Sequence, residues 1–512
     1  MAHHLPPELW AHIALYLEED RLSLTKCVRV CRQLQPVFER LIYRRVKVES
    51  EELQPKDGFI PLARFKSLAN QMRQSFVRRV EYTVVIPYNI PDYRATKLEG
   101  YSEQNALRDA NNEAFQAGIS SLFEFLTTWK EDSKISLALE VQGRVRMLEP
   151  ETKANQNAKE WQGELRGERV TRPYRAQFPS GDASMLTEVS CVDHLIVQYL
   201  YRSQGIATGA FLQIAERCAA LRRLHLDMPG QLRPDHVEYM RERREALASG
   251  LSRLPSTLQV FECVGCSEQP WSNTLPALDL RSAKGIDELS SSLRLFSCNL
   301  RELRLRLMSV DMDFLFPLDE RGNPLPDSSS LYWPHLETIA LNGVAEYTPT
   351  GEWLFDYELE SGDEEDFPDP ETGDEIFESR WLREEYEISR EKMNTEHFHR
   401  LFVSLGYASH RMPVLRLITF SVAGSPRTKF TLTTTSGAWG VIEDCHASTL
   451  SLPSSSRPLL GFRSDSAYRP DRRVADAWGF ELDEMKVVDE GPREDYHFVV
   501  CSVTLDRARL DR

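Results

Sequence analysis

Residues 300–307 read Leu-Arg-Glu-Leu-Arg-Leu-Arg-Leu, and the pattern of this stretch indicates the fold of a large part of the chain. Its apolar residues follow the order apolar, two residues, apolar, one residue, apolar. Successive side chains of a β-strand point to opposite faces, so Leu303 and Leu305 share one face and Arg304 and Arg306 share the other. The stretch therefore predicts a strand with one buried and one open face.

The same order of apolar residues returns along the chain. Clear copies stand at Leu221, Leu224 and Leu226; at Leu258, Phe261 and Cys263; at Leu336, Ile339 and Leu341; and at Leu415, Ile418 and Phe420. Weaker copies stand at Val77, Val80 and Tyr82 and at Val192, Leu195 and Val197. From Leu221 onward the clear copies, including residues 300–307, begin 37, 42, 36 and 79 residues apart, and the last step is close to two periods. Recurrence at this spacing indicates internal repeats.

Helical segments precede most of the predicted strands. They cover residues 112–129, 210–220, 236–254, 286–295 and 395–408. Helix and strand in alternation are typical of an α/β fold with a parallel sheet. The phrase Leu-x-x-Leu-x-Leu resembles the strand of a leucine-rich repeat, in which stacked strands line one face. We therefore predict an irregular, leucine-rich-repeat-like βα solenoid over residues 49–426. The alternative is an irregular α/β domain whose buried strands read alike.

The first 48 residues carry a separate apolar pattern. Leu9, Ile13, Tyr16 and Leu17 form one helical stripe, and Pro7 suits the first position of that helix. Further short helices are expected over residues 22–34 and 36–43. Three short helices cannot bury a sufficient core alone, so we expect them to dock on a partner. The alternative is a three-helix cap on a larger domain.

The opening Leu5-Pro-Pro-Glu-Leu9, the apolar residues after it and the triplet Val30-Cys-Arg32 resemble an F-box. An F-box joins a protein to a Skp–cullin ubiquitin ligase. The resemblance implies a three-helix domain over residues 1–48 that binds the Skp adaptor and, through it, the cullin scaffold. It also implies the adaptor-binding residues, which are Leu5, Pro6, Leu9, Ile13, Leu17, Val30 and Cys31.

Three later phrases resemble filamentous-fungal F-box proteins that have a long repeat region. They are Phe76-Val-Arg-Arg-Val-Glu-Tyr82, Trp333-Pro-His-Leu-Glu-Thr-Ile339, and Tyr468-Arg-Pro470 followed by Ala477-Trp478. This resemblance implies no particular substrate.

Composition narrows the class of partner and the compartment. A net charge of −16 argues against a chain that coats nucleic acid or an anionic membrane. Nine scattered cysteines favour reduced thiols over a disulfide framework. No apolar run approaches the roughly 18 residues of a membrane span, and the N-terminus lacks the apolar core of a secretory signal. We expect a cytoplasmic or nuclear protein with no nucleic-acid and no membrane partner.

Two regions depart from the repeated pattern. Residues 352–396 hold 18 acidic and 4 basic residues, and we interpret them as an insertion because the strand phrase resumes at Leu415. From residue 427 onward, strands are expected over residues 429–435 and 496–505 with a short helix over residues 471–478. We predict a small α/β cap over residues 427–512.

No motif in the sequence indicates bond chemistry. Cys263-x-x-Cys266 could be half of a zinc site, but a structural zinc site needs four ligands. Cys263 also stands at an inward apolar position, so core packing is the favoured reading. Phosphate-binding loops and nucleophile elbows are lacking. We therefore predict no catalytic residue, no metal and no cofactor, with an enzyme of unrecognised site as the less favoured alternative.

Substrate binding is expected on the open face of the predicted strands. The candidates are Arg223, His225, Glu262, Arg304, Arg306, Thr338, Asn342 and Thr419. Arg304 and Arg306 either bind a ligand or pair with nearby acids such as Glu302, and the sequence does not decide between these readings. With the N-terminal resemblance, this face implies a non-catalytic substrate receptor that holds an unknown protein substrate near a ubiquitin-charged enzyme. A scaffold that binds the adaptor without directing ubiquitination is the alternative.

Overall fold

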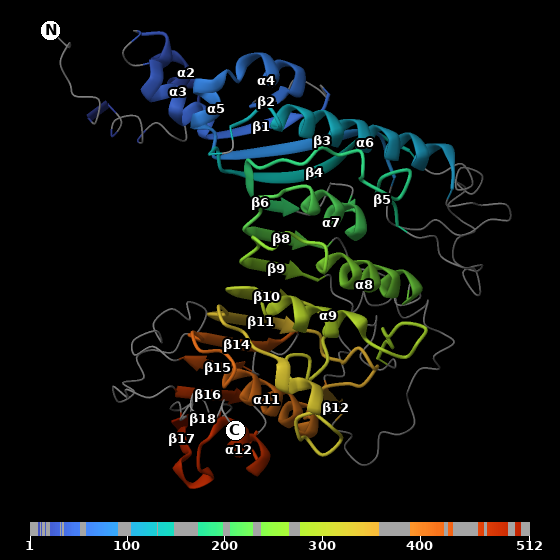
Figure 1. The fold of residues 1–512 in the computed structure, drawn as a ribbon, viewed down its shortest axis with the longest axis vertical. Helices are drawn as coiled ribbons and strands as arrows, with labels where there is room; N and C mark the ends of the chain where they lie inside the picture. The colour runs from blue at the N-terminus through green and yellow to red at the C-terminus, as the bar shows by residue number, and fades with distance from the viewer. Residues whose placement is uncertain are drawn as a thin grey trace, which may run out of the picture. The chain divides into compact units, whose positions relative to one another are not determined.

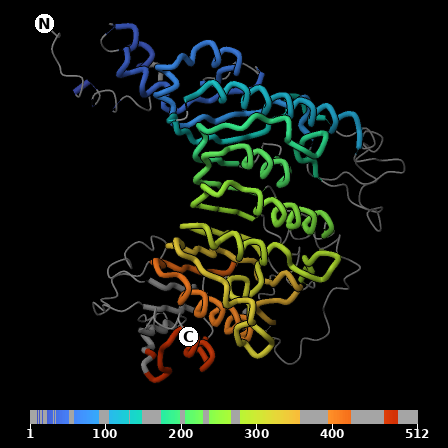
Figure 2. The backbone as a smooth tube through the Cα atoms, viewed as in Figure 1, coloured from blue at the N-terminus to red at the C-terminus, as the bar shows by residue number. Residues whose placement is uncertain are grey.

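The computed structural model describes residues 9–10, 12, 16, 21–30, 32, 35–51, 58–90, 104–130, 132–147, 173–197, 205–228, 237–265, 277–357, 390–423, 429–433, 459–464, 468–489 and 497–502. They form an α/β fold in which most strand pairs are parallel (Figure 1). The chain divides into two compact units (Figure 2). Unit 1 comprises Met1–Gln162, Gly167–Pro229 and Leu254–Leu258, and unit 2 comprises Gly163–Arg166, Gly230–Arg253 and Gln259–Arg512.

The main sheet of unit 1 is entirely parallel in the order β8-β6-β4-β3-β1-β2. Its strands are β1 (Arg45–Glu49), β2 (Phe59–Pro61), β3 (Arg79–Asn89), β4 (Ile135–Arg146), β6 (Val192–Val197) and β8 (Arg223–Asp227). A second, two-stranded sheet pairs β5 (Arg175–Ala176) with β7 (Gly205–Ile206). The weaker copies of the strand phrase therefore form strands β3 and β6, as the alternation predicts.

The helices of unit 1 are α2 (Arg21–Val28), α3 (Gln35–Arg44), α4 (Leu62–Leu68), α5 (Gln71–Phe76), α6 (Ala106–Leu126) and α7 (Thr208–Glu216). Helix α6 is capped by Asn105, whose side chain accepts hydrogen bonds from the backbone N–H groups of Leu107 and Arg108, and the helix packs along β3. The Tyr82 hydroxyl on β3 donates to the Gly118 carbonyl on α6 at 2.8 Å. A Cβ on Gly118 would stand 2.9 Å from the Val84 side chain, so this glycine permits the close helix–sheet approach.

Helix α3 passes into strand β1 without an intervening residue, because α3 ends at Arg44 and β1 begins at Arg45. The predicted domain border at residue 48 falls inside β1. On the other side, the buried Glu39 of α3 forms an ion pair of 2.8 Å with Arg73 of α5. The direct passage into β1 joins α3 to the parallel sheet, and the ion pair joins α3 to α5.

The main sheet of unit 2 has the order β17-β18-β16-β15-β14-β11-β10-β9. Strands β9 (Val260–Val264), β10 (Glu302–Arg306), β11 (Thr338–Val344) and β14 (Leu417–Val422) are parallel. Strands β15 (Lys429–Thr433), β16 (Leu459–Ser464), β17 (Lys486–Asp489) and β18 (His497–Ser502) continue the sheet with antiparallel pairing. The C-terminal strands thus extend the sheet that the repeated phrase builds.

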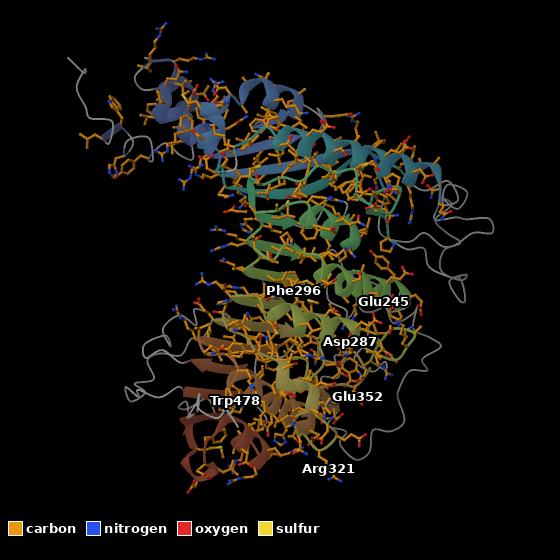
Figure 3. The ribbon with its side chains drawn as sticks, viewed as in Figure 1. Glu245, Asp287, Phe296, Arg321, Glu352 and Trp478 are labelled. Carbon is orange, nitrogen blue, oxygen red and sulfur yellow. The ribbon has the colours of Figure 1, made fainter. Side chains whose placement is uncertain are left out.

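The helices of unit 2 are α8 (Val237–Leu251), α9 (Glu288–Ser297), α11 (Thr395–Ser409) and α12 (Arg472–Trp478), with the 3-10 turns η3 (Pro326–Ser330) and η6 (Leu482–Glu484). Helices α11 and α12 pack closely, since a Cβ on Gly406 would stand 2.9 Å from Ala477. Trp478 lies on α12 (Figure 3). Its buried indole N–H donates to the Phe402 carbonyl at 2.8 Å. The predicted helices over residues 236–254, 286–295, 395–408 and 471–478 are all present within a few residues.

The two ends of the predicted acidic insertion meet in the structure. Strand β12 (Phe355–Tyr357) pairs antiparallel with β13 (Arg390–Met393), while residues 358–389 lie outside the described residues. Phe355 is buried and its ring contacts Phe398 on α11. The flanks of the insertion are therefore anchored to unit 2. Across the described ranges, no helix is long and apolar enough to cross a bilayer.

Candidate functional site

The predicted substrate-binding residues divide between the two units. Arg223 and His225 lie on β8 of unit 1, and the other six lie on β9, β10, β11 and β14 of unit 2. In both units these positions alternate with buried residues, such as Leu224 on β8 and Leu303 on β10. The predicted period-two alternation is therefore confirmed at these strands. The structure brings the candidates together within each unit.

In unit 2, strand register sets the candidates in two rows. One row runs Glu262, Arg304, Ala340 and Thr419, and the next includes Arg306 and Asn342. The Thr419 hydroxyl donates to the Asn342 side-chain oxygen at 3.2 Å. These residues form one polar surface, to which half-buried Thr338 also belongs.

Arg304 and Arg306 differ in their partners. The Arg304 guanidinium donates to the Glu302 carboxylate on its own strand at 2.8 Å, so for this arginine the structure shows the acid pairing rather than the ligand-binding reading. Arg306 is exposed and forms no ion pair with any residue that the structure describes. Of the two arginines, Arg306 is thus the one with a guanidinium available to a ligand.

In unit 1, the register places Arg223 at the end of a row of polar residues. Arg45 pairs with Arg79, Arg79 with Ser136, Ser136 with His194, and His194 with Arg223. The next residue of each strand is buried on the opposite face: Val46, Val80, Leu137, Leu195 and Leu224. We call the first set the basic row.

The charges at one end of the basic row are partly balanced. The Glu81 carboxylate on β3 forms an ion pair with Arg45 at 2.5 Å and another with Arg79 at 3.0 Å. One carboxylate therefore contacts two guanidinium groups. At the other end, exposed Arg223 forms no ion pair within the described part of the chain.

His194 lies in the basic row, where burial and neighbouring charges shift the pKa of its imidazole. Its Nδ1 stands 3.4 Å from the Ser136 hydroxyl. Burial and then the nearby Arg223 guanidinium lower the pKa of His194, with smaller contributions in the same direction from His225 and Arg79 and an opposing one from Asp193. The imidazole is therefore neutral near pH 7 and can accept a proton when an anion approaches.

The described part of the predicted adaptor site is a small helical core with exposed apolar neighbours. Leu24 of α2 and Phe38 of α3 are buried together, and Trp10 packs against them. Leu9 and Val30 remain 47% and 70% exposed. The other predicted adaptor residues, Leu5, Pro6, Ile13, Leu17 and Cys31, lie outside the described residues.

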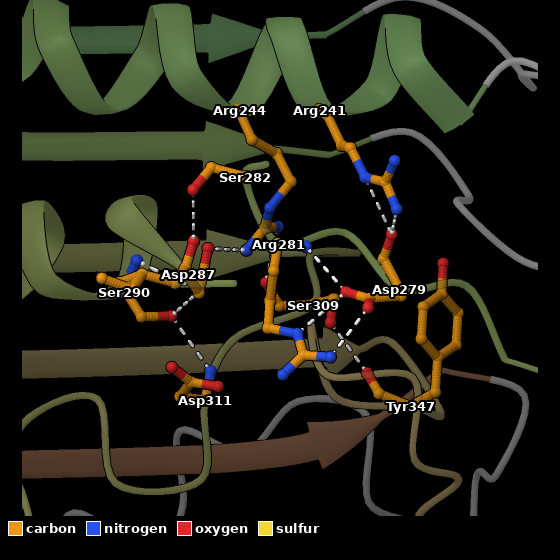
Figure 4. A network of polar contacts seen from close by, with 11 residues as sticks. Arg241, Arg244, Asp279, Arg281, Ser282, Asp287, Ser290, Ser309, Asp311 and Tyr347 are labelled. Carbon is orange, nitrogen blue, oxygen red and sulfur yellow. Dashed lines mark hydrogen bonds and ion pairs between the residues drawn. The ribbon is translucent and has the colours of Figure 1, made fainter. Parts of the chain in front are cut away.

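A buried polar network joins α8 to α9 in unit 2 (Figure 4). The Arg244 guanidinium contacts the Asp287 carboxylate at 2.8 Å, and these side chains are 5% and 3% exposed. Arg244 also donates to the Ser309 carbonyl at 2.9 Å. Asp287 caps α9 by accepting from the backbone and hydroxyl of Ser290. Each member of the pair therefore makes hydrogen bonds beyond the ion pair itself, which helps to offset the cost of burying the charges.

Asp311 lies at the edge of this network. Its backbone N–H donates to the Ser290 hydroxyl at 3.0 Å. Burial raises the pKa of the Asp311 carboxyl to about 7, and the carboxylates of Asp287 and Asp313 act in the same direction against Arg244 and Arg294. The group therefore holds its proton up to near-neutral pH.

Sequence reasoning missed four members of the basic row, Arg45, Arg79, Ser136 and His194. The signal for two of them was present, because the weaker copies of the phrase at Val77 and Val192 place Arg79 and His194 at alternating positions. Applying the same alternation to every copy would have found them. The Arg244–Asp287 pair has no such signal, since its partners stand 43 residues apart.

Within the described ranges, no group of three side chains that could ligate a metal ion occurs, so these residues form no candidate metal site. Cys263 is fully buried on β9, in agreement with its reading as a core residue, and Cys266 lies outside the described residues. No protein-family model matches the chain, and no curated protein matches it.

Proposed function

We propose that the chain is a non-catalytic substrate receptor of a Skp–cullin–F-box ubiquitin ligase. The helices at the N-terminus bind the Skp adaptor, and the open faces of a leucine-rich-repeat-like βα array bind a protein substrate. Such a receptor contributes proximity, because it holds the substrate near a ubiquitin-charged enzyme. It would act in the cytoplasm or the nucleus.

The observation that carries this proposal is the exposure of Leu9 and Val30 beside the Leu24–Phe38 core. Tyr16 in the same region is 91% exposed. Large apolar side chains that stay outside a neighbouring core are typical of a surface covered by a partner. Leu9 and Val30 are also two of the positions at which the F-box resemblance implies adaptor contact.

The test is a double substitution at these exposed positions. Leu9→Ala with Val30→Ala should weaken adaptor binding by more than about tenfold, because removing one anchor from an apolar contact commonly costs about 2 kcal/mol. Neither side chain is buried, so the thermal unfolding midpoint should stay unchanged. Binding is measured by titrating purified adaptor in isothermal calorimetry.

Met72→Ala is the matched control, because Met72 on α5 is also apolar and 49% exposed but lies outside the predicted contact set. It should leave adaptor affinity unchanged. Equal binding by the double variant and the parent chain would rule out the F-box assignment. Copurification of cullin with the adaptor then separates a ligase subunit from a scaffold without a ubiquitination role.

A further inference from the structure

The basic row gives unit 1 a binding surface of defined length. Neighbouring strands of a sheet lie about 4.8 Å apart, so Arg79 and Arg223, three strands apart, are separated by roughly 14 Å. Arg45 extends the row by one more strand, to about 19 Å. The backbone beneath it is fixed by strand pairing and by the buried residues of the opposite face. The row is therefore a preformed surface.

The charge along the row is concentrated at its two ends. Arg45 and Arg79 both contact the Glu81 carboxylate at one end, and exposed Arg223 stands at the other. Between them lie Ser136 and His194, which are hydrogen-bonding groups without a fixed charge near pH 7. The whole chain carries a net charge of −16, so a row with three arginines is a local exception. Its complement is a ligand with two negative groups.

We infer that the basic row binds an acidic, extended segment of a partner protein, with one carboxylate at Arg45 and Arg79 and another at Arg223. The identification of that partner as a substrate rests on the proposed receptor function. The binding itself is measured without the adaptor, so the two proposals can fail separately.

The surroundings of the row favour a peptide over nucleic acid. Glu140 of β4 and Asp227 of β8 stand on the same face, four residues further along the strands that carry Ser136 and Arg223. A polyanion with a phosphate at every step would meet these carboxylates. A peptide can place its acidic side chains at the row and neutral side chains elsewhere.

The length of the row specifies the spacing of the acids. An extended peptide advances about 3.4 Å per residue, so side chains at i and i+4 stand about 14 Å apart and on the same side. That distance equals the separation of Arg79 from Arg223. A segment with Glu or Asp at i and i+4 should therefore engage both ends of the row, whereas acids at i and i+1 can engage only one.

The experiment measures fluorescence anisotropy of labelled ten-residue Gly/Ser peptides with the full chain at low ionic strength. One peptide carries Glu at i and i+4, a second carries Glu at i and i+1, and a third carries Lys at i and i+4. The first should bind at least about threefold tighter than the second, and the third should not bind. Raising the salt concentration should weaken the first peptide's binding, because surface charges are screened.

Arg223→Glu should weaken binding of the i, i+4 peptide by about tenfold, since it removes one attraction and adds one repulsion. Arg64→Glu on α4 is the matched control, because it makes the same charge change at an exposed position of unit 1 outside the row. It should weaken binding less than about twofold. Arg223→Gln is the second variant, with a loss of about threefold and no added repulsion.

The pH profile gives an independent readout. A carboxylate bound beside His194 favours the imidazolium form, so affinity should rise as the pH falls from 7 to about 5.5. The groups around His194 are Asp193 on its own strand, Arg223 and His225 on β8, Arg79 on β3 and Ser136 on β4. His194→Gln should remove the pH dependence and keep the preference for acidic peptides.

Three results would overturn the inference. They are no binding of the i, i+4 peptide at low salt, equal losses from Arg223→Glu and Arg64→Glu, and tighter binding of a single-stranded oligonucleotide through the same arginines. Adaptor binding in the same preparation shows whether the proposed receptor function stands independently of these results.

Discussion

The Asp311 carboxyl allows a direct test of the polar network between α8 and α9. Asp311→Asn keeps the size of the side chain and removes its ionisation. In the folded protein this carboxyl retains its proton up to a pKa of about 7, and its ordinary pKa is 3.8. At the lowest pH the group is protonated in both states and contributes nothing. As the pH rises above about 4, the unfolded chain loses this proton first, so the free energy of unfolding falls until about pH 7.

The size of the effect follows from the same pKa values. A change from 3.8 to about 7 corresponds to at most about 4 kcal/mol of unfolding free energy. Asp311 is partly exposed, so solvent screening reduces this value, and we expect about 1–2 kcal/mol. The Asn variant should therefore be more stable than the parent chain by that amount at pH 8 and nearly equal to it at pH 4.

The assay is urea denaturation of both chains at several pH values between about 4 and 8. Asp327→Asn is the control, because it makes the same chemical change at an exposed position of η3. As a surface substitution it should change the unfolding free energy by less than about 0.5 kcal/mol. A difference for Asp311→Asn that is independent of pH, or a less stable variant at pH 8, would refute the reasoning. The latter result would mean that Arg244 and Arg294 hold the carboxyl in its charged form.

Two further substitutions test packing in unit 1. Gly143→Ala should destabilise the chain by more than about 2 kcal/mol in urea denaturation, because the added Cβ would stand 2.3–2.5 Å from Asn89 on β3 and force the two strands apart; a loss below about 0.5 kcal/mol would contradict this reading. Arg73→Met should cost about 2–3 kcal/mol by the same assay, because it leaves the buried Glu39 carboxylate without its 2.8 Å partner. Burial opposes the shift, but the hydrogen bond from Arg73 helps to hold the pKa of Glu39 below its ordinary value of 4.5, so that cost should shrink as the pH falls below 4.5 and the carboxylate takes up a proton; a loss that stays constant with pH would argue against the ion pair.

The parallel strands could be predicted from the sequence because their pattern is local. Leu303 and Leu305 must face the core, and this requirement fixes both the face of Arg304 and the register with neighbouring strands. The change to antiparallel pairing at β15 was also within reach. Only residues 423–428 separate β14 from β15, and a parallel connection needs a dozen residues or more.

The ion pairs could not be predicted in the same way. Glu39 and Arg73 are 34 residues apart, and they meet only because α3 and α5 pack against each other. The pairing of Arg304 with Glu302, by contrast, is local, and the sequence already offered it as one reading. Contacts within a strand follow from alternation, whereas contacts between helices depend on packing that no local pattern specifies.

The direct passage from α3 into β1 fixes the distance between this helix and anything bound on the basic row. Arg44 closes the helix and Arg45 opens both the strand and the basic row. A peptide held on the row would lie a fixed, short path from α3, because no residue separates this helix from β1. Because this path is fixed, the effective concentration of one bound partner around the other is set by one arrangement of α3 and the row. Under the proposed receptor function, lysines of a bound substrate would then be modified according to their distance from the row.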